Sequence, residues 1–228
     1  MGRMAARAMD ASRQLARSRG PFPAFAESRD RKVGVVPVRN ATRLAIAPAG
    51  TLSLIAGCSS GIEPLFAVAY TRHALDGREL VEVNARFEAL ATREGAWPSD
   101  LRRAMLESGR VRQLMEVPLA VRRLFPTAQD VPAEHQLRVQ AAFQAHVDNA
   151  VSKTINLPAE ATVADVLEVY RRAFALGCKG ITLYRHGTKA GQVLTPLGRS
   201  SVCPDCMSSV EFAEGVRLCR ACGFSSTS

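Results

Sequence analysis

The chain has 228 residues, of which 47% are hydrophobic and 22% charged, and its formal net charge is +9. This length suits one domain with a small appendage, and the composition is that of a globular chain able to bury a core. No run of eighteen apolar residues occurs, which argues against a transmembrane helix. Asp10, Arg13 and Arg17 interrupt the N-terminal stretch where a secretory signal would need apolar residues, so we expect a cytoplasmic protein without membrane contact.

The positive charge is concentrated near the N-terminus. Residues 1–43 contain ten Arg or Lys against three acidic residues, a net +7. Helical spacing of the apolar residues from Met4 to Leu15 predicts a helix over 4–18. Such a segment could attract phosphates in a nucleic acid, a nucleotide or an acidic partner. A solvated arginine-rich face is an equally good interpretation, because no aromatic residues interleave with the arginines for base stacking.

The next elements are predicted from prolines and from apolar periodicity. Pro21 and Pro23 predict an extended segment through Phe25. Val33–Val38 resembles a strand but contains Pro37, which favours an edge or a loop. Further on, periodicity predicts helices over 84–94, 99–108, 133–152 and 163–176, and a short strand over 181–184. The last helix has a start signal, with Thr162 before it and Asp165 three residues on.

Residues 46–66, IAPAGTLSLIAGCSSGIEPLF, are rich in Gly, Ser and Thr between two short apolar runs. Small residues let backbone N–H groups approach a ligand closely, and a turn that opens a helix aims those groups at an anion. A phosphate-binding loop is therefore one interpretation, and a tight turn between two core segments is the other. A Walker loop is excluded, because no Lys-Ser or Lys-Thr pair follows the glycine at the required spacing.

The C-terminal residues carry the most specific local motif, two C-x-x-C pairs separated by twelve residues. Four thiolates from two such turns can surround a zinc ion tetrahedrally, and a hairpin turning at 214–215 would bring them together. The alternative is a redox role, because a C-x-x-C pair can exchange disulfides. Cys58 and Cys178 have apolar neighbours and are interpreted as small core residues. The candidate ligands are Cys203, Cys206, Cys219 and Cys222.

Taken together, these segments resemble a known family. The stretches RNATRLAIAPAGTLSLIAGCSSGIEPLFAVAYTR, HVDNAVSKTINLP and GCKGITLYRHGTKAGQVL, followed by the C-x-x-C pairs, are similar to the C-terminal portion of adenosylcobalamin-dependent (class II) ribonucleotide reductases. The resemblance runs from about Ala5 to Gly223. The finger loop with the radical cysteine, and the cysteines that reduce the substrate, belong to the upstream part of that family and have no counterpart here.

The resemblance implies the small (C-terminal) subunit of a split class II reductase. Its fold class would be α/β: residues 1–198 would be the C-terminal segment of a ten-stranded α/β barrel, and 199–228 a zinc-ribbon-like tail with four cysteine ligands. Its partner would be the large catalytic subunit, which would hold adenosylcobalamin. The complex would act as a ribonucleoside-diphosphate reductase. We expect the small chain to be inactive alone, and we assign it no catalytic residue of its own.

In this family the loop at 47–53 binds the phosphates of the ribonucleotide substrate. The resemblance thus implies substrate binding by Ala49, Gly50, Thr51, Leu52 and Ser53. Ala49 replaces a threonine of the family pattern, which removes one hydroxyl contact and would cost on the order of 1–3 kcal/mol. Glu63 would order the loop from its rim, or serve as an acidic charge at a helix N-terminus.

A second departure lies at the end of the chain. The family often has a further cysteine a few residues after the last C-x-x-C pair, on a tail that carries reducing equivalents. Thr227 stands near that place here, which favours zinc over a redox role. We do not expect nucleic acid as a partner, although a zinc-ribbon protein that binds nucleic acid through the basic N-terminal segment is the rival hypothesis. A decayed gene fragment without function is the third.

Overall fold

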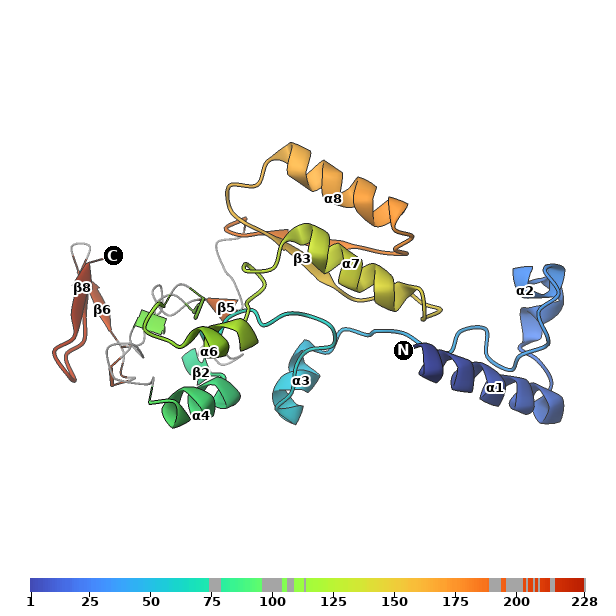
Figure 1. The fold of residues 1–228 in the computed structure, drawn as a ribbon, viewed down its shortest axis with the longest axis horizontal. Helices are drawn as coiled ribbons and strands as arrows, with labels where there is room; N and C mark the ends of the chain where they lie inside the picture. The colour runs from blue at the N-terminus through green and yellow to red at the C-terminus, as the bar shows by residue number, and fades with distance from the viewer. Residues whose placement is uncertain are drawn as a thin grey trace. The chain divides into compact units, whose positions relative to one another are not determined.

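The fold is taken from a computed structural model of the chain (Figure 1). It describes residues 1–73, 79–95, 104–105, 109–112, 114–188, 194–195, 203, 205–206, 208, 210–213 and 216–227. The chain forms two compact units: unit 1 comprises Met1–Glu63 with Pro132–Arg185, and unit 2 comprises Pro64–Val131 with His186–Ser228.

Unit 1 begins with the helix α1 (Gly2–Arg19), which confirms the helix predicted over 4–18. The Val33–Val38 segment is a loop, in agreement with the effect expected of its proline. Val38 at its end is fully buried, and its carbonyl accepts a hydrogen bond from the Phe22 amide at 3.1 Å. The loop therefore lies along the chain that leaves α1.

The segment after α1 corrects the sequence prediction. An extended conformation is predicted from Pro21 to Phe25, but the 3-10 helix η1 covers Pro23–Glu27. Pro23 occupies the first helical position, where its fixed φ and missing N–H are compatible with a helix start. The short helix α2 (Arg29–Lys32) follows it directly.

Two helices and two parallel strands form the core of unit 1. Helix α7 (Ala133–Gln144) precedes β3 (Thr154–Leu157), and α8 (Val163–Ala175) connects β3 to the parallel strand β4 (Thr182–Arg185). Residues 155 and 157 of β3 point to the same side of the strand pair. Buried side chains of both helices pack against them there (Figure 1). The buried core consists of Leu137, Ile155, Leu157, Val169 and Ala173.

The two helices of this core differ in how well the sequence predicts them. Helix α8 begins with the expected capping box: the Thr162 hydroxyl accepts from the Asp165 amide, and the Asp165 carboxylate accepts from the Thr162 amide. Helix α7 ends at Gln144 and not at Ser152 as predicted. The Gln144 side chain donates to the carbonyls of Val147 and Asn149, which stabilises a turn that leaves the helix axis.

Unit 2 is built on an antiparallel sheet in the order β2-β1-β5. Its strands are β1 (Ala69–His73), β2 (Glu79–Val83) and β5 (Leu194–Thr195). Helix α4 (Ala85–Arg93) follows β2, and α6 (Leu119–Leu124) lies further along. The Asn84 side chain accepts from two amides of the first turn of α4, which confirms the helix predicted over 84–94. The helix predicted over 99–108 lies largely outside the described residues.

A second hydrophobic core lies in the Pro64–Val131 part of unit 2. It joins β1, α4 and α6 through interlocking apolar side chains, with the rings of Phe87 and Phe125 packed edge to face at 5.3 Å. Its buried members are Val68, Ala69, Phe87, Ala91, Met105, Val111, Val117, Val121 and Phe125.

The C-terminal part of the chain forms a small antiparallel sheet in the order β6-β7-β8. Its strands are β6 (Glu211–Ala213), β7 (Val216–Leu218) and β8 (Ser225–Thr227). The pairing of β6 with β7 confirms the predicted hairpin, whose turn residues 214–215 lie outside the described residues. Among the described helices, none has the length and hydropathy needed to cross a membrane.

Candidate functional site

The predicted phosphate loop leads into a short helix. Helix α3 spans Gly50–Ala56, and its first internal hydrogen bond runs from the Ser53 amide to the Ala49 carbonyl at 2.8 Å. The amides of residues 50–52 therefore have no acceptor within the helix, as in the first turn of any α-helix. Three donors point out of the helix start, in the direction that favours an anion.

The side chains of the loop are small or exposed. Gly50, Thr51 and Leu52 are exposed, and half-buried Ala49 stands at the N-cap position, where it offers no side-chain acceptor. Ser53 is buried, and its hydroxyl donates to the Gly50 carbonyl at 2.7 Å. The structure thus brings the five predicted residues together, with Ser53 bonded to the first turn of the helix.

Helix α3 also corrects two expectations about burial. In the tight-turn interpretation Leu52 and Ile55 would belong to a core segment, but they are 65% and 79% exposed. Cys58 is predicted to lie in the core and is exposed as well, whereas Cys178 is half-buried against the core of unit 1. The helix therefore stands out from unit 1 and does not fill its interior.

Both ends of the segment that contains α3 are attached to the same stretch of chain. Before the loop, Ile46 forms a parallel bridge with Val151, and its carbonyl accepts from the Ser152 amide at 2.9 Å. After the helix, Glu63 accepts from the Thr154 amide at 2.6 Å. The phosphate loop and α3 are therefore an excursion whose two ends are fixed to a single short stretch, residues 151–154.

A buried ion pair makes the second attachment. Lys153, whose side chain is 1% exposed, donates to the carboxylate of Glu63 at 2.7 Å. Its ammonium also donates to the Gln136 side-chain oxygen at 3.1 Å and to the Thr154 carbonyl at 2.6 Å. All three ammonium protons therefore have acceptors, so none of the buried donors of Lys153 is left without a hydrogen bond.

The sequence places Glu63 at the rim of the loop but gives no indication of Lys153. The two residues lie 90 positions apart, and no local pattern connects them. A signal exists in α7, where Gln136, Gln140 and Gln144 recur every four residues on a helix that packs against β3. Their buried side-chain amides donate to backbone carbonyls of nearby segments of the same chain.

A third contact fixes the chain that approaches the loop. The Asp148 carboxylate accepts from the Arg43 amide at 2.8 Å and from the Leu44 amide at 3.2 Å, and it pairs with the Arg43 guanidinium. Partial burial raises the pKa of Asp148, but these donors outweigh burial and hold the pKa below its ordinary value. Asp148 thus fixes the segment that enters the loop by an ion pair and two backbone hydrogen bonds.

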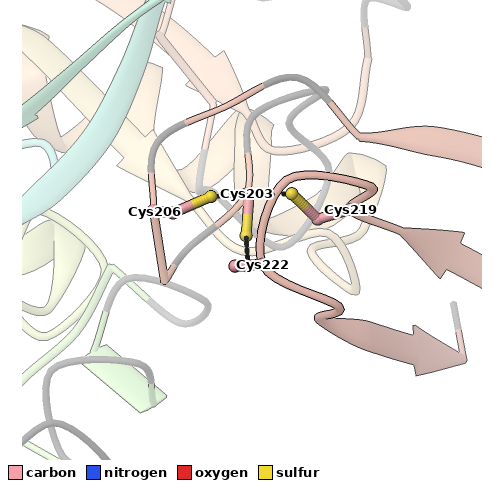
Figure 2. A group of neighbouring side chains, drawn as sticks. All are labelled: Cys203, Cys206, Cys219 and Cys222. Carbon is pink, nitrogen blue, oxygen red and sulfur yellow. Dashed lines mark hydrogen bonds between the residues drawn. The ribbon is translucent and has the colours of Figure 1, made fainter.

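The four candidate metal ligands lie together at the C-terminal sheet (Figure 2). Their sulfur atoms are all within 4.8 Å of one another. Cys203 lies 3.5 Å from Cys222, and Cys206 lies 3.6 Å from Cys219, each distance measured between Sγ atoms. These separations exceed the roughly 2.05 Å of a disulfide bond, and all four thiols are free.

The donor set fits a tetrahedral zinc ion. Sulfur atoms about 2.3 Å from a central zinc would lie about 3.8 Å apart, close to the observed separations. Cys203 and Cys219 are buried and form the centre of a small cluster with Val210 and Phe224. Four buried residues are a small core, so a metal crosslink would supply the stability that apolar burial does not.

Crowding of the thiols spreads their pKa values. Hydrogen bonds from Ser208 lower the pKa of Cys206 to about 6. The Phe224 amide lowers the pKa of Cys222, but burial and the three neighbouring cysteines outweigh it and raise that pKa to about 12. The pKa of Cys206 therefore lies well below that of Cys222, although the two thiols belong to the same cluster.

The chain belongs to the ribonucleotide reductase barrel-domain family, whose signature matches residues 30–184. It is 49% identical over 195 residues to the vitamin B12-dependent ribonucleoside-diphosphate reductase of Mycobacterium tuberculosis (strain CDC 1551 / Oshkosh), a match that covers 86% of this chain and 28% of that protein. It is 45% identical over 185 residues to the enzyme of the same name from Thermoplasma acidophilum, covering 81% of this chain and 24% of that protein.

A solved structure supports the fold. The alpha subunit of the class Id ribonucleotide reductase of Actinobacillus ureae matches with a TM-score of 0.65 at 22% sequence identity, covering 82% of this chain and 33% of that one. These relatives confirm the reductase fold expected from the sequence. The described residues form parallel β3-α8-β4 and antiparallel sheets, and the chain spans about a quarter of the curated relatives' length.

Proposed function

We propose that this chain is the small component of a split, vitamin B12-dependent ribonucleotide reductase. The observation that carries the proposal is the contrast in coverage: 86% of this chain matches a B12-dependent reductase, yet only 28% of that reductase is matched. The remaining part of the enzyme would be a large polypeptide that carries the radical and redox cysteines. Together the two would convert ribonucleotides, as diphosphates, to deoxyribonucleotides in the cytoplasm.

Adenosylcobalamin would generate the radical that begins the reaction. The relatives are named as vitamin B12-dependent enzymes, and we assign the cofactor to the large polypeptide. None of the residues described in this chain is assigned to hold it. The contribution of this chain is to bind and orient the substrate.

We further propose that the α3 loop binds the substrate's phosphates. The amides of residues 50–52 would donate to phosphate oxygens, and the Thr51 hydroxyl is exposed beside them. The Glu63–Lys153 pair and the Ile46–Val151 bridge support this role, because they fix both ends of the loop before a ligand arrives. Preorganisation of this kind reduces the entropy lost on binding.

Reconstitution tests the assignment to a split enzyme. The full chain and the large polypeptide are mixed with adenosylcobalamin, a reductant and a ribonucleoside diphosphate, and deoxyribonucleotide formation is measured. We expect activity from the mixture and none from either part alone. Equal activity of the large polypeptide without this chain would overturn the proposal.

Two substitutions at Gly50 test the phosphate loop. A Cβ added at Gly50 meets no atom of the chain within 4 Å, so the substitutions create no internal clash at that atom. Gly50→Val should obstruct close approach of a phosphate and raise the KM for nucleotide about tenfold, which corresponds to about 1.4 kcal/mol. Gly50→Ala is the matched control with a smaller side chain and a smaller effect. An unchanged KM in the valine variant would assign the loop a purely architectural role.

We also propose that Cys203, Cys206, Cys219 and Cys222 hold one structural zinc ion. The sulfur separations described above support this assignment. The zinc would crosslink the C-x-x-C pair before β6, Cys203 and Cys206, to the pair between β7 and β8, Cys219 and Cys222. It would take no part in the reaction. This leaves reduction of the substrate to cysteines of the large polypeptide.

A nucleic-acid-binding zinc ribbon is the second candidate, and the net charge of +7 in residues 1–43 favours it. It predicts that the isolated chain binds DNA or RNA with an affinity that falls steeply with salt. Fluorescence anisotropy with labelled single- and double-stranded DNA and RNA at about 50 and about 200 mM salt distinguishes the two functions. The reductase proposal expects no such binding at the higher salt concentration.

A further inference from the structure

Helix α8 carries two apolar stripes. Its first stripe faces the core of unit 1 and consists of Val166, Val169, Ala173 and Leu176, the last just past the end of the helix. A second stripe points to solvent, with side chains 87%, 47%, 48% and 86% exposed at Val163, Leu167, Tyr170 and Phe174, respectively. The spacing of the second stripe, at positions i, i+4, i+7 and i+11, is that of one continuous helix face.

With the second stripe, the apolar surface of α8 is wider than a helix at the edge of a core needs. Successive residues rotate by about 100° around a helix, so the centres of the two stripes lie about 110° apart. Together they make about half of the helix circumference apolar, whereas a helix packed on one side needs a single stripe about 100° wide. Helix α7, in the same unit, has no large apolar side chain exposed among its described residues. The exposed stripe of α8 is therefore not shared by α7, the other helix of this core.

The strand beside α8 lies at the edge of its sheet. Within the part of the chain that the structure describes, β4 pairs only with β3, in parallel. The other side of β3 is approached by the chain at Ile46, which bridges Val151 just before the strand. The strand order therefore ends at β4, and parallel sheets of two strands are rarely complete. The outer edge of β4 and the second stripe of α8 belong to the same β-α-β element.

We infer that the second stripe of α8 and the outer edge of β4 form the surface on which the large reductase polypeptide docks. This inference rests on the proposed function. Both features lie almost wholly within residues 30–184, the part matched to the barrel domain, and the curated relatives contain about three to four times as much chain as this protein supplies. The occupant would be a further strand and helix of the barrel, pairing parallel to β4 and covering the α8 stripe.

A second copy of this chain fits the surface less well. A symmetric dimer places the same edge of both copies against each other, so two β4 strands paired edge to edge would run antiparallel. The sheet is parallel at this point, and parallel α/β elements continue with parallel neighbours. A large polypeptide with its own β-α units can supply a parallel strand and a helix at the same time.

Two variants of the full chain test the inference. Phe174→Glu places a charge on the second stripe, where the side chain is 86% exposed, so the isolated chain should keep its circular dichroism spectrum and melting temperature. Ala175→Glu adds the same charge to the next residue, which is exposed on the polar side of the helix. The Kd of each variant for the large polypeptide is measured by isothermal titration calorimetry.

We expect Phe174→Glu to weaken binding by at least about tenfold and Ala175→Glu by less than about twofold, because only the first charge would be buried against the partner. Equal Kd values for both variants and the unchanged chain would overturn the docking surface while leaving the split enzyme in place. Failure of the unchanged chain to bind the large polypeptide would overturn the proposed function and the surface with it. Self-association of the unchanged chain that Phe174→Glu abolishes, with binding of the large polypeptide unaffected, would assign the stripe to a second copy and overturn the inference.

Discussion

The core of unit 1 and the C-terminal cysteine unit are stabilised by different means. The unit 1 core joins two helices and two strands through apolar burial, and partly buried side chains from Ala133 to Leu183 surround it. The cysteine unit buries four residues, of which two are cysteines that the proposed zinc would bind. The comparison indicates that the first region folds from its own apolar side chains, whereas the second requires a crosslink.

The largest expected effect comes from removing that crosslink. Cys219→Ser should release the metal and unfold β6–β8, because structural zinc sites supply about 10–16 kcal/mol of apparent binding energy. The helices of unit 1 should be retained, since they have a separate core. Elemental analysis should find about one zinc per chain before the substitution and none after it, and amide hydrogen exchange should become fast only in the C-terminal strands.

Cys58→Ser is the matched control for this experiment, because Cys58 is an exposed thiol outside the cluster. It should leave both zinc content and exchange rates unchanged. Protein purified under reducing conditions without metal, whose C-terminal cysteines cycle between dithiol and disulfide during turnover, would contradict the structural zinc. Such a result would restore the redox interpretation of the two C-x-x-C pairs.

A smaller effect is expected from the buried ion pair of unit 1. Lys153→Met leaves the Glu63 carboxylate, which is 26% exposed, without its cation. Breaking a buried pair costs about 3–5 kcal/mol, and the partial exposure of Glu63 places this case near the lower of these values. Urea unfolding followed by circular dichroism measures the loss, and the KM for nucleotide should rise as well because the end of the phosphate loop is released.

The double variant Lys153→Met with Glu63→Gln provides the control for that prediction. It removes both charges, so no unpaired carboxylate is left and stability should partly recover relative to Lys153→Met alone. If the loss of unfolding free energy in the double variant equals the sum of the losses in the two single variants, the two residues do not interact.

The smallest effect concerns acid stability of the α7–α8 contact. Glu134 accepts hydrogen bonds from Arg172 at 2.7 Å and from Arg138 at 3.0 Å, which lower its pKa from 4.5 to about 2. Because the folded pKa is the lower one, the stabilisation is complete above pH 4.5 and is lost as the pH falls toward about 2. Glu134→Gln should therefore destabilise the chain slightly at neutral pH and not at the acid end of this range.

Thermal unfolding at several pH values measures this difference. The pair is exposed, so salt at about 0.5 M should reduce the effect further. An unchanged pH profile in the glutamine variant would show that the Glu134 contacts contribute nothing to the packing of α7 on α8. Apolar burial would then account for the whole contact, which would make the contrast with the cysteine unit sharper.

Local chemistry explains what the sequence predicts correctly. The capping box of Thr162 and Asp165 determines the start of α8, and the two C-x-x-C spacings determine which thiols meet. Each of these features depends on residues within one turn or one short motif. The Gly-rich segment leads into a helix, which agrees with one of its two interpretations, a turn that opens a helix.

Features that depend on distant residues are not predicted. The contacts of Glu63 with Lys153 and of Arg43 with Asp148 join residues 90 and 105 positions apart, and no pattern within either segment indicates them. Helix α7 is predicted too long because its periodicity continues past Gln144, whose side chain bonds to the following turn. The four-residue strand β3 is not predicted, whereas β4, of equal length, is indicated by Gly180 before it and by the polar turn after it.

The two attachments of the phosphate loop also have a consequence for the order of folding. Helix α3 and its flanking residues come early in the chain, but both anchors lie at residues 151–154, after α7. Bringing Glu63 and Lys153 together over 90 residues costs loop-closure entropy that the formation of a single helix does not. The loop therefore gains its final shape only after α7 and β3 have come together, and the residues proposed to bind phosphate are among the last of unit 1 to reach their final positions.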